Sequence, residues 1–272
     1  MTTTSTRHFN VCIAALGAVL AGHAGAAAQT GGAVSVSAAG CGPSVNRSVP
    51  TTTPQDTFTL SAVTACGGIS ADAQVRADAL VPSIGLAAHA VNSSSNSSAS
   101  AFVSLSDVWT VNVPPGTPVR GTFTLPVSFR LEGNVSPGAL YGDRFDRFID
   151  FVGSLGQVGT ATGLFQASGT VNTTGIIDQT FPGFATFTNY GPTVPTLANF
   201  EISLSMPFLQ FGTVDFFNTL AAVVDVPPGF TITSSSGKTL FAVTPVPEPE
   251  TYLLLLVGVG VLATRRARRR TG

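Results

Sequence analysis

The sequence predicts an all-β body, an antiparallel β-sandwich of the jelly-roll type, with a different kind of segment at each end. Three observations predict it: apolar and polar residues alternate with period two, Gly, Pro and Ser separate the alternating segments, and charge is sparse. The 272 residues include 29 Gly and 18 Pro, and only 10% of the side chains are charged against 44% that are hydrophobic. Many short strands joined by such turns indicate two packed sheets.

The alternation is clearest in residues 69–79. One parity holds the apolar positions Ile69, Ala71, Ala73 and Val75, and the other holds Asp72, Gln74, Arg76 and Asp78. A strand with this pattern buries one face and exposes the other.

Two longer runs repeat the pattern on either side of a turn. The first has the apolar positions Val103, Leu105, Trp109, Val111 and Val113, and the second has Val119, Phe123, Leu125, Val127, Phe129 and Leu131. The turn Pro114-Pro115-Gly116 between them predicts that the two runs form an antiparallel pair. Pro126 predicts an edge position or a bulge in the second run. Further strands are predicted at 170–177, 184–189, 200–205, 214–226 and 239–243.

Two stretches interrupt the strand pattern. Residues 92–100 are rich in Ser and Asn, which is typical of a solvated loop, with a glycan acceptor as the alternative. Residues 141–152 fit a short helix or the start of a strand, because Phe145, Phe148, Ile149 and Val152 fall at helical spacing. Asp143, Asp146 and Asp150 in this stretch are candidate calcium ligands. Arg144 and Arg147 lie between them, and this favours a solvated polar face.

Residues 1–28 are typical of a secretory signal peptide, which the Sec-type export machinery would accept. Arg7 provides the positive start, residues 11–21 the apolar centre, and three alanines the cleavage site, between Ala28 and Gln29. A buried helix is the alternative. The expected body is residues 29–244.

The body keeps Cys41 and Cys66 as its two cysteines and His89 as its one histidine. In an oxidising compartment, two cysteines form one disulfide, with two unpaired thiols as the alternative. A zinc site of Cys and His is excluded for want of ligands, so we expect no metal and no cofactor.

The body shows no motif for catalysis, so we expect that it is not an enzyme. His89 lies in the apolar run 86–91, which predicts a structural role, and no Gly-x-Ser-x-Gly elbow or Walker-type glycine loop is present. A pair of carboxylates for glycoside cleavage stays open, because their separation is spatial. The 14 carboxylates and seven basic residues between Arg47 and Glu250 leave that part at −7, which excludes nucleic acid as a partner.

The C-terminus combines a short apolar segment with a basic end. Residues 251–264 are 14 uncharged residues, followed by Arg265, Arg266, Arg268, Arg269 and Arg270. As a helix this segment extends about 21 Å, short of the roughly 30 Å hydrocarbon core. The arginines and Tyr252 at its ends nevertheless favour a single transmembrane helix with a cytoplasmic tail.

The tripeptide Pro247-Glu248-Pro249, preceded by Val246, stands directly before this helix. In this order, residues 245–272 resemble the PEP-CTERM sorting signal of Gram-negative bacteria, with motif 246–250, helix 251–264 and basic tail 265–270. The resemblance implies that an exosortase reads and processes the signal at the periplasmic face. It also implies a setting of exopolysaccharide export, with exopolysaccharide as a further partner.

The resulting expectation is a surface or matrix protein of Gram-negative bacteria with a structural or interaction role. It would cross the inner membrane, be held transiently by the C-terminal helix, and end at the cell surface or in the extracellular matrix. The alternative is a carbohydrate-active enzyme or sugar-binding module displayed at the surface. Trp109, Tyr141 and Tyr190 are the body's few Trp and Tyr residues, which gives sugar stacking weak support.

Overall fold

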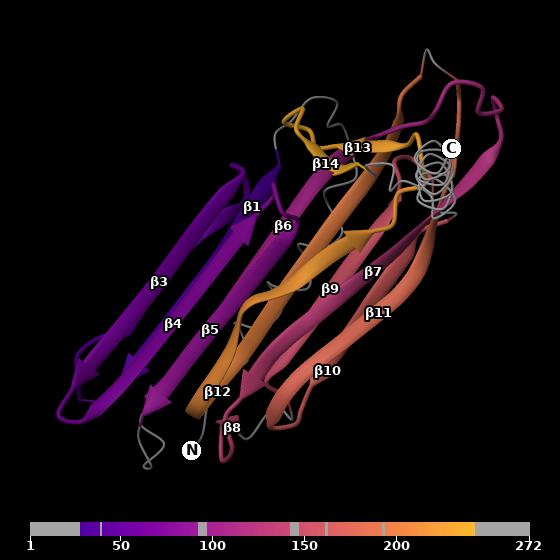
Figure 1. Ribbon diagram of the computed structural model, residues 1–272. Coiled ribbons are helices and arrows are strands. Elements are labelled where there is room, and N and C mark those ends of the chain that lie inside the picture. Colours follow the sequence, from indigo (N-terminus) through magenta and orange to yellow (C-terminus); the bar gives the residue numbers. More distant parts are fainter. Residues whose placement is uncertain are drawn as a thin grey trace, which may run out of the picture.

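The structure is a computed structural model that describes residues 28–38, 40–91, 97–141, 147–160, 163–191 and 194–242. All the regular secondary structure in these ranges is β-strand, so the all-β prediction is confirmed. All strand pairs are antiparallel, and Figure 1 shows an elongated body with the long strands running side by side.

The strands form two layers, joined by a strand that belongs to both. The first layer runs in the order β2 (Val45–Pro54), β1 (Gln29–Ala38), β6 (Ser97–Asn112), β12 (Thr196–Val224), β9 (Ile149–Gln157) and β10 (Phe165–Val171). The second layer runs β3 (Thr57–Cys66), β4 (Ile69–Asp78), β5 (Ser83–Val91), β12, β7 (Thr122–Val135) and β11 (Gly175–Thr188). The hairpin of β13 (Thr231–Thr233) and β14 (Thr239–Ala242) extends along β6, and β8 (Leu140–Tyr141) pairs with β12.

The long strand β12 passes from the first layer to the second. Its first part pairs with β6 and β9 and its second part with β5 and β7. The pairing register with β6 shifts between Met206 and Leu209, and Gly212 follows with a φ of 100°. A Cβ at Gly212 would lie 2.8 Å from atoms of Ala139, so both the backbone angle and the space require glycine here.

The core lies between the two layers and is rich in aromatic rings. Trp109 of β6 stacks on Phe200 of β12 with ring centroids 4.1 Å apart, and Phe200 faces Phe129 of β7 at 6.5 Å. Gly153 of β9 leaves room for the Phe129 ring, which a Cβ at Gly153 would approach to 2.7 Å. A large ring on one layer thus packs against a glycine on the other, and such complementary sizes let facing sheets pack closely.

The predicted alternation at 69–79 is confirmed, since Ala71, Ala73 and Val75 of β4 are buried and the charged parity is not. The predicted pairing of 103–113 with 119–131 is wrong. These runs became β6 and β7, which lie in different layers and both pair with β12 instead. Val119 is 59% exposed and Arg120 has a φ of 61°, so both belong to the connection that crosses between layers, and the strand starts at Thr122.

The expectation for Pro126 needs correction as well. It lies on β7, which has neighbours on both sides. Pairing of β7 with β12 ends at Val127 and Val224, and the N–H of Asp225 donates to the carbonyl of Pro126 at 2.9 Å. The missing N–H of Pro126 therefore falls at the end of the β7–β12 ladder, where Asp225 donates to the Pro126 carbonyl and the return bond is not needed to continue the pairing.

Four of the remaining strand predictions correspond to observed strands, and one does not. Residues 184–189 overlap the end of β11, 200–205 and 214–226 fall mostly within β12, and 239–243 corresponds to β14. The segment 170–177 is not one strand, because the turn between β10 and β11 lies inside it. Of the expected loop 92–100, residues 97–100 belong to β6, and 92–96 lie outside the described residues. At 141–152, the strand-start alternative holds from Ile149 onward.

Candidate functional site

The predicted export and sorting residues lie almost wholly outside the described residues. This applies to Val246, Pro247, Glu248 and Pro249, to the helix 251–264, and to Arg265, Arg266, Arg268, Arg269 and Arg270. The predicted cleavage point is described: β1 begins at Gln29, and Ala28 is buried and accepts a hydrogen bond from the N–H of Gln55 at 3.0 Å. In the described part of the chain, no helix has the length and apolar character needed to cross a membrane.

The structure brings Cys41 and Cys66 to disulfide distance, with their Cα atoms 5.3 Å apart. That separation lies inside the range of about 4.4–6.8 Å usual for disulfides. Cys41 precedes β2 and Cys66 ends β3, so a bridge would fasten the edges of the two layers together.

His89 is on the outer face of the second layer. Its Nδ1 lies 3.3 Å from Oδ1 of Asp72, and the two side chains are 43% and 46% exposed. Asp72 and Thr213 are its cross-strand partners on β4 and β12. Acid, imidazole and hydroxyl residues thus occupy one row across three strands, on an exposed sheet face rather than in either depression described below.

A shallow apolar groove lies elsewhere on the outer face of this layer. It has a volume of about 320 Å³ and is lined by Pro126, Val127, Ser128, Pro182, Gly183, Phe184, Val223 and Asp225. Phe184 and Val223 are 66% and 51% exposed. Residues 126–128 of β7 lie between β11 and β12, which bring Phe184 and Val223 to its two sides. An apolar floor with a hydroxyl and a carboxylate at its rim suits a ligand that is apolar on one face and polar at its edges.

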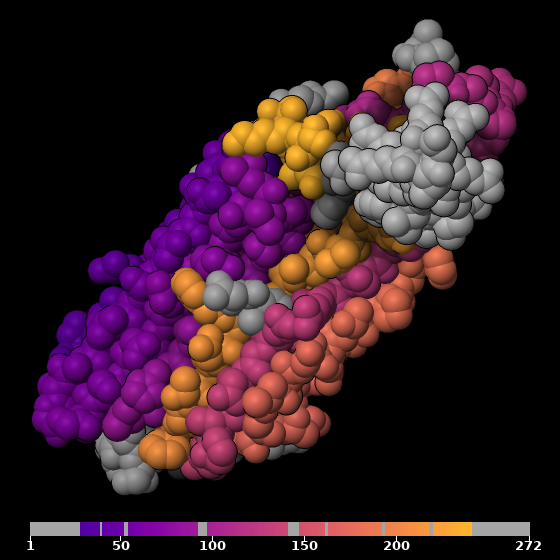
Figure 2. All heavy atoms as spheres, in the orientation of Figure 1, coloured from indigo at the N-terminus to yellow at the C-terminus, as the bar shows by residue number. Residues whose placement is uncertain are grey.

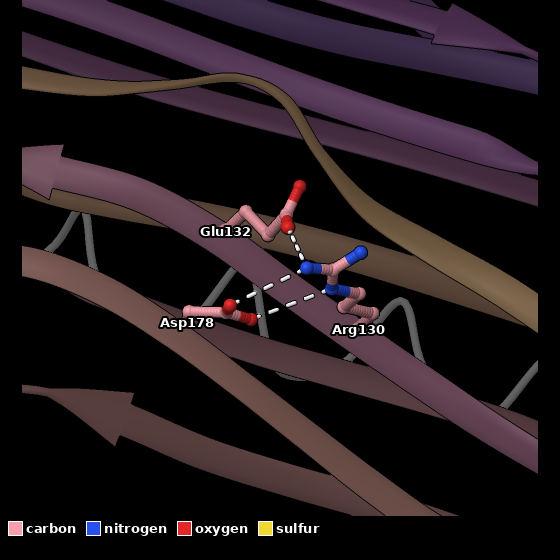
Figure 3. A network of polar contacts seen from close by, with 3 residues as sticks. All are labelled: Arg130, Glu132 and Asp178. Carbon is pink, nitrogen blue, oxygen red and sulfur yellow. Dashed lines mark hydrogen bonds and ion pairs between the residues drawn. The ribbon is translucent and has the colours of Figure 1, made fainter.

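An ion cluster of Arg130, Glu132 and Asp178 joins β7 and β11 (Figure 3), and Arg130 lies two residues along β7 from Ser128 of the groove. Arg130 of β7 contacts Asp178 of β11 through Nε and Nη2, each 3.3 Å from a carboxylate oxygen, and Nη2 also contacts Glu132. The hydrogen bonds and charge of Asp178, followed by the charge of Glu132, raise the pKa of Arg130. Because both carboxylates are engaged by one guanidinium, they are placed for ion pairing rather than as a free acid and base.

Asp107 is the most deeply buried carboxylate in the described residues, at 6% exposure. It lies on β6, and its Oδ1 accepts hydrogen bonds from the N–H of Val108 at 2.8 Å and from the N–H of Ser235 at 3.3 Å. The Ser235 hydroxyl donates to the same oxygen. Burial raises the pKa of Asp107, while the hydrogen bonds from Ser235 oppose the rise.

Burial also raises the pKa of Glu201 on β12. Its cross-strand partners are Ser106 of β6 and Ser154 of β9, so a carboxyl lies among hydroxyl groups on the outer face of the first layer. The ion pairs found within the described ranges do not include it.

Of the three candidate calcium ligands, only Asp150 is among the described residues. Asp143 and Asp146 lie outside the described residues, and Asp150 pairs with Arg147 at 3.2 Å and accepts a hydrogen bond from Thr170 at 3.0 Å. Within the described ranges, no three His, Cys, Asp or Glu side chains gather as a metal site would require.

A second depression, larger than the groove, has a volume of about 610 Å³. It is lined by Ala139, Leu140, Phe148, Asn172, Thr173 and Thr174, none of which has a titratable side chain.

Sequence reasoning missed the groove, because its members come from three strands whose neighbours could not be assigned. The available signal was that Phe184 and Phe187 stand at opposite parities of one predicted strand, so that one of the two rings has to face outward. It also missed Asp107. A lone Asp at an inward position of β6 departs from the alternation, and this departure was the available signal of a buried polar contact.

Comparison with known proteins bears on the C-terminal segment that follows the all-β body. Residues 245–270 match the family described as the PEP-CTERM protein-sorting motif. The chain thus carries the sorting motif that its C-terminus resembled, which is consistent with an exported protein sorted by an exosortase. No curated protein matches the chain in sequence.

Proposed function

We propose that this protein is a non-catalytic structural or interaction component of the cell surface or exopolysaccharide matrix, delivered by exosortase processing of its C-terminus. The match of residues 245–270 to the PEP-CTERM motif is the observation that carries the proposal. The signal peptide 1–28, cleaved before Gln29, would start export through the Sec-type machinery. The helix 251–264 would hold the chain in the inner membrane of a Gram-negative cell until the exosortase acts.

The two-layer body supports a passive role. It is a sandwich, which we propose to be of the jelly-roll kind, held by a continuous core from both layers. Its paired carboxylates Glu132 and Asp178 are engaged by Arg130, and the Asp72 and His89 pair lies on an open face. These arrangements stabilise strand pairs and do not require a substrate.

The test separates sorting from export. In Glu248→Ala, the signal peptide and the apolar helix are unchanged, so export and membrane insertion should continue while the unprocessed form accumulates. Thr244→Ala, which lies just before the matched segment 245–270, is the control and should be processed normally. Immunoblots of membrane, surface and medium fractions, in hosts with and without the exosortase, measure this. Equal processing of both variants, or processing without exosortase, would reduce the tail to a plain membrane anchor.

A second candidate function is sugar binding at the groove between β11, β7 and β12. The apolar face of a pyranose ring can pack on an exposed ring such as Phe184, and its hydroxyls can bond with Ser128 and Asp225 at the rim. Exopolysaccharide would be the ligand. This candidate adds a partner to the matrix role and does not replace it.

A further inference from the structure

The open edge of β3 differs from the other edges of the two layers. Among the described residues β3 pairs with β4 alone, and Figures 1 and 2 place this part of the chain along one long side of the body. Its ten residues, TFTLSAVTAC, include no charged residue and no proline. A long uncharged edge offers a row of N–H and C=O groups to any strand that can approach it.

The other three edges carry the features that normally prevent such pairing. The neighbouring edge β2 contains Arg47, Pro50 and Pro54. On the opposite side, β10 has only 7 residues. The long edge strand β11 contains Asp178 and Pro182, and the N–H of its Thr186 already donates to the carbonyl of Gly163 at 2.9 Å. Charge, proline, coverage or short length protects these strands, and β3 has none of the four.

The hairpin geometry identifies which residues of β3 point their backbone outward. β3 and β4 are joined by Gly67 and Gly68, with φ of 56° and 83°, and Cys66 pairs with Ile69 across this two-residue turn. The residues that flank such a turn exchange hydrogen bonds, so Cys66 and every second residue before it bond to β4. The alternate residues present their N–H and C=O groups to the open edge; they are Thr57, Thr59, Ser61, Val63 and Ala65.

Both ends of β3 are held in place. At one end Cys66 is at disulfide distance from Cys41. At the other, the N–H of Ala79 donates to the carbonyl of Asp56 at 2.7 Å, and the N–H of Gln55 donates to Ala28 at 3.0 Å. A strand that is already extended loses little conformational entropy when a partner strand is added.

We propose that β3 pairs antiparallel with β3 of a second copy of this chain about a two-fold axis, which joins the second layers of two molecules into one sheet. With Ser61 at the axis, Thr59 faces Val63 and Thr57 faces Ala65, so no charges oppose each other. The chain is acidic between Arg47 and Glu250, and two copies therefore approach most easily along a segment that carries no charge. The outward Val63, at 65% exposure, gains Thr59 of the second copy as its cross-strand neighbour.

Two substitutions at the exposed Ser61 test the pairing in full-length protein in mild detergent. Ser61→Lys puts two like charges at the axis, and Ser61→Pro removes an outward N–H without touching the bonds to β4. Ser168→Lys, at an exposed position of the edge strand β10, is the matched control. Sedimentation analysis measures self-association, and thermal unfolding checks that each variant is folded.

The unsubstituted protein and Ser168→Lys should dimerise alike. Ser61→Lys should weaken the dimer by about tenfold or more, with partial recovery in high salt, because exposed like charges are screened. Ser61→Pro should weaken it without recovery; if that variant unfolds, Ser61→Lys decides. A protein that stays monomeric at every concentration overturns the proposal, even if a different protein binds to β3. So does Ser61→Lys that associates as tightly as the control. Neither result bears on exosortase sorting.

Discussion

Asp107 of β6 and Ser235, which follows β13, are joined by two hydrogen bonds to one carboxylate oxygen. The backbone N–H and the hydroxyl of Ser235 both donate to Oδ1 of Asp107. Together with the pairing of β13 along β6, they fasten the last described hairpin to the body. This hairpin comes directly before the sorting motif in the chain, so the contact fixes where the sorting segment leaves the folded domain.

This contact predicts a pH dependence of stability. Burial raises the pKa of Asp107 in the folded state. The stability linked to this group is therefore complete below the unfolded pKa and is lost as pH rises through the folded pKa. Asp107→Asn should remove that loss and still accept hydrogen bonds from Ser235. Asp107→Ala should cost about 1–3 kcal/mol, because the Ser235 donors lose their partner. Urea unfolding from about pH 4 to pH 7 measures all three proteins; an unchanged pH slope in Asp107→Asn would contradict the assignment.

The cysteine prediction concerns the protein recovered from the envelope. Cys41 and Cys66 should be bridged, and neither should react with a thiol label under non-reducing denaturation. Replacement of both by Ser should cost roughly 3–4 kcal/mol in the chain-entropy account, because the bridge closes a loop of 25 residues. Full labelling of both sulfurs would show that the body holds two free thiols.

The groove predicts a ligand response that depends on one ring. If the host's exopolysaccharide packs on Phe184, Phe184→Ala should weaken binding by about tenfold, since fully burying a Phe side chain contributes about 1.5–3 kcal/mol and a sugar covers only part of the ring. Ile176→Ala is the matched control, because Ile176 is also exposed on β11 but does not line the groove. Calorimetric titration of the two variants with the polysaccharide compares them. Equal affinities would remove the groove as a sugar site.

The arginine tail should act differently from the tripeptide. Deletion of residues 265–270 removes the charges that keep the C-terminal end in the cytoplasm, so the short apolar helix should be retained less well. The expected result is unprocessed protein in the medium, in contrast to Glu248→Ala, which should accumulate in the membrane. Fractionation and immunoblotting distinguish the two defects. An identical distribution of both variants would show that tripeptide and arginines serve one step.

Local patterns predicted the faces of strands better than their partners. The alternation at β4 placed Ala71, Ala73 and Val75 inside, because side-chain direction depends only on the parity of the chain. The same parity cannot report which strand lies alongside. β6 and β7 follow each other with a Pro-Pro-Gly turn between them, yet that connection crosses between layers, and β12 from much later in the chain became a partner of both.

The sequence by itself determined the all-β character and the C-terminal sorting motif, because both depend on residues that are close neighbours in the chain. Strand parity repeats every two residues, and the motif at 245–270 is a continuous segment. The tertiary structure decided the transfer of β12 between layers, the groove at Phe184, the contact of Asp107 with Ser235 and the open edge of β3. Each of these depends on which segments, far apart in the chain, lie side by side, and only the packing of the two layers decides that.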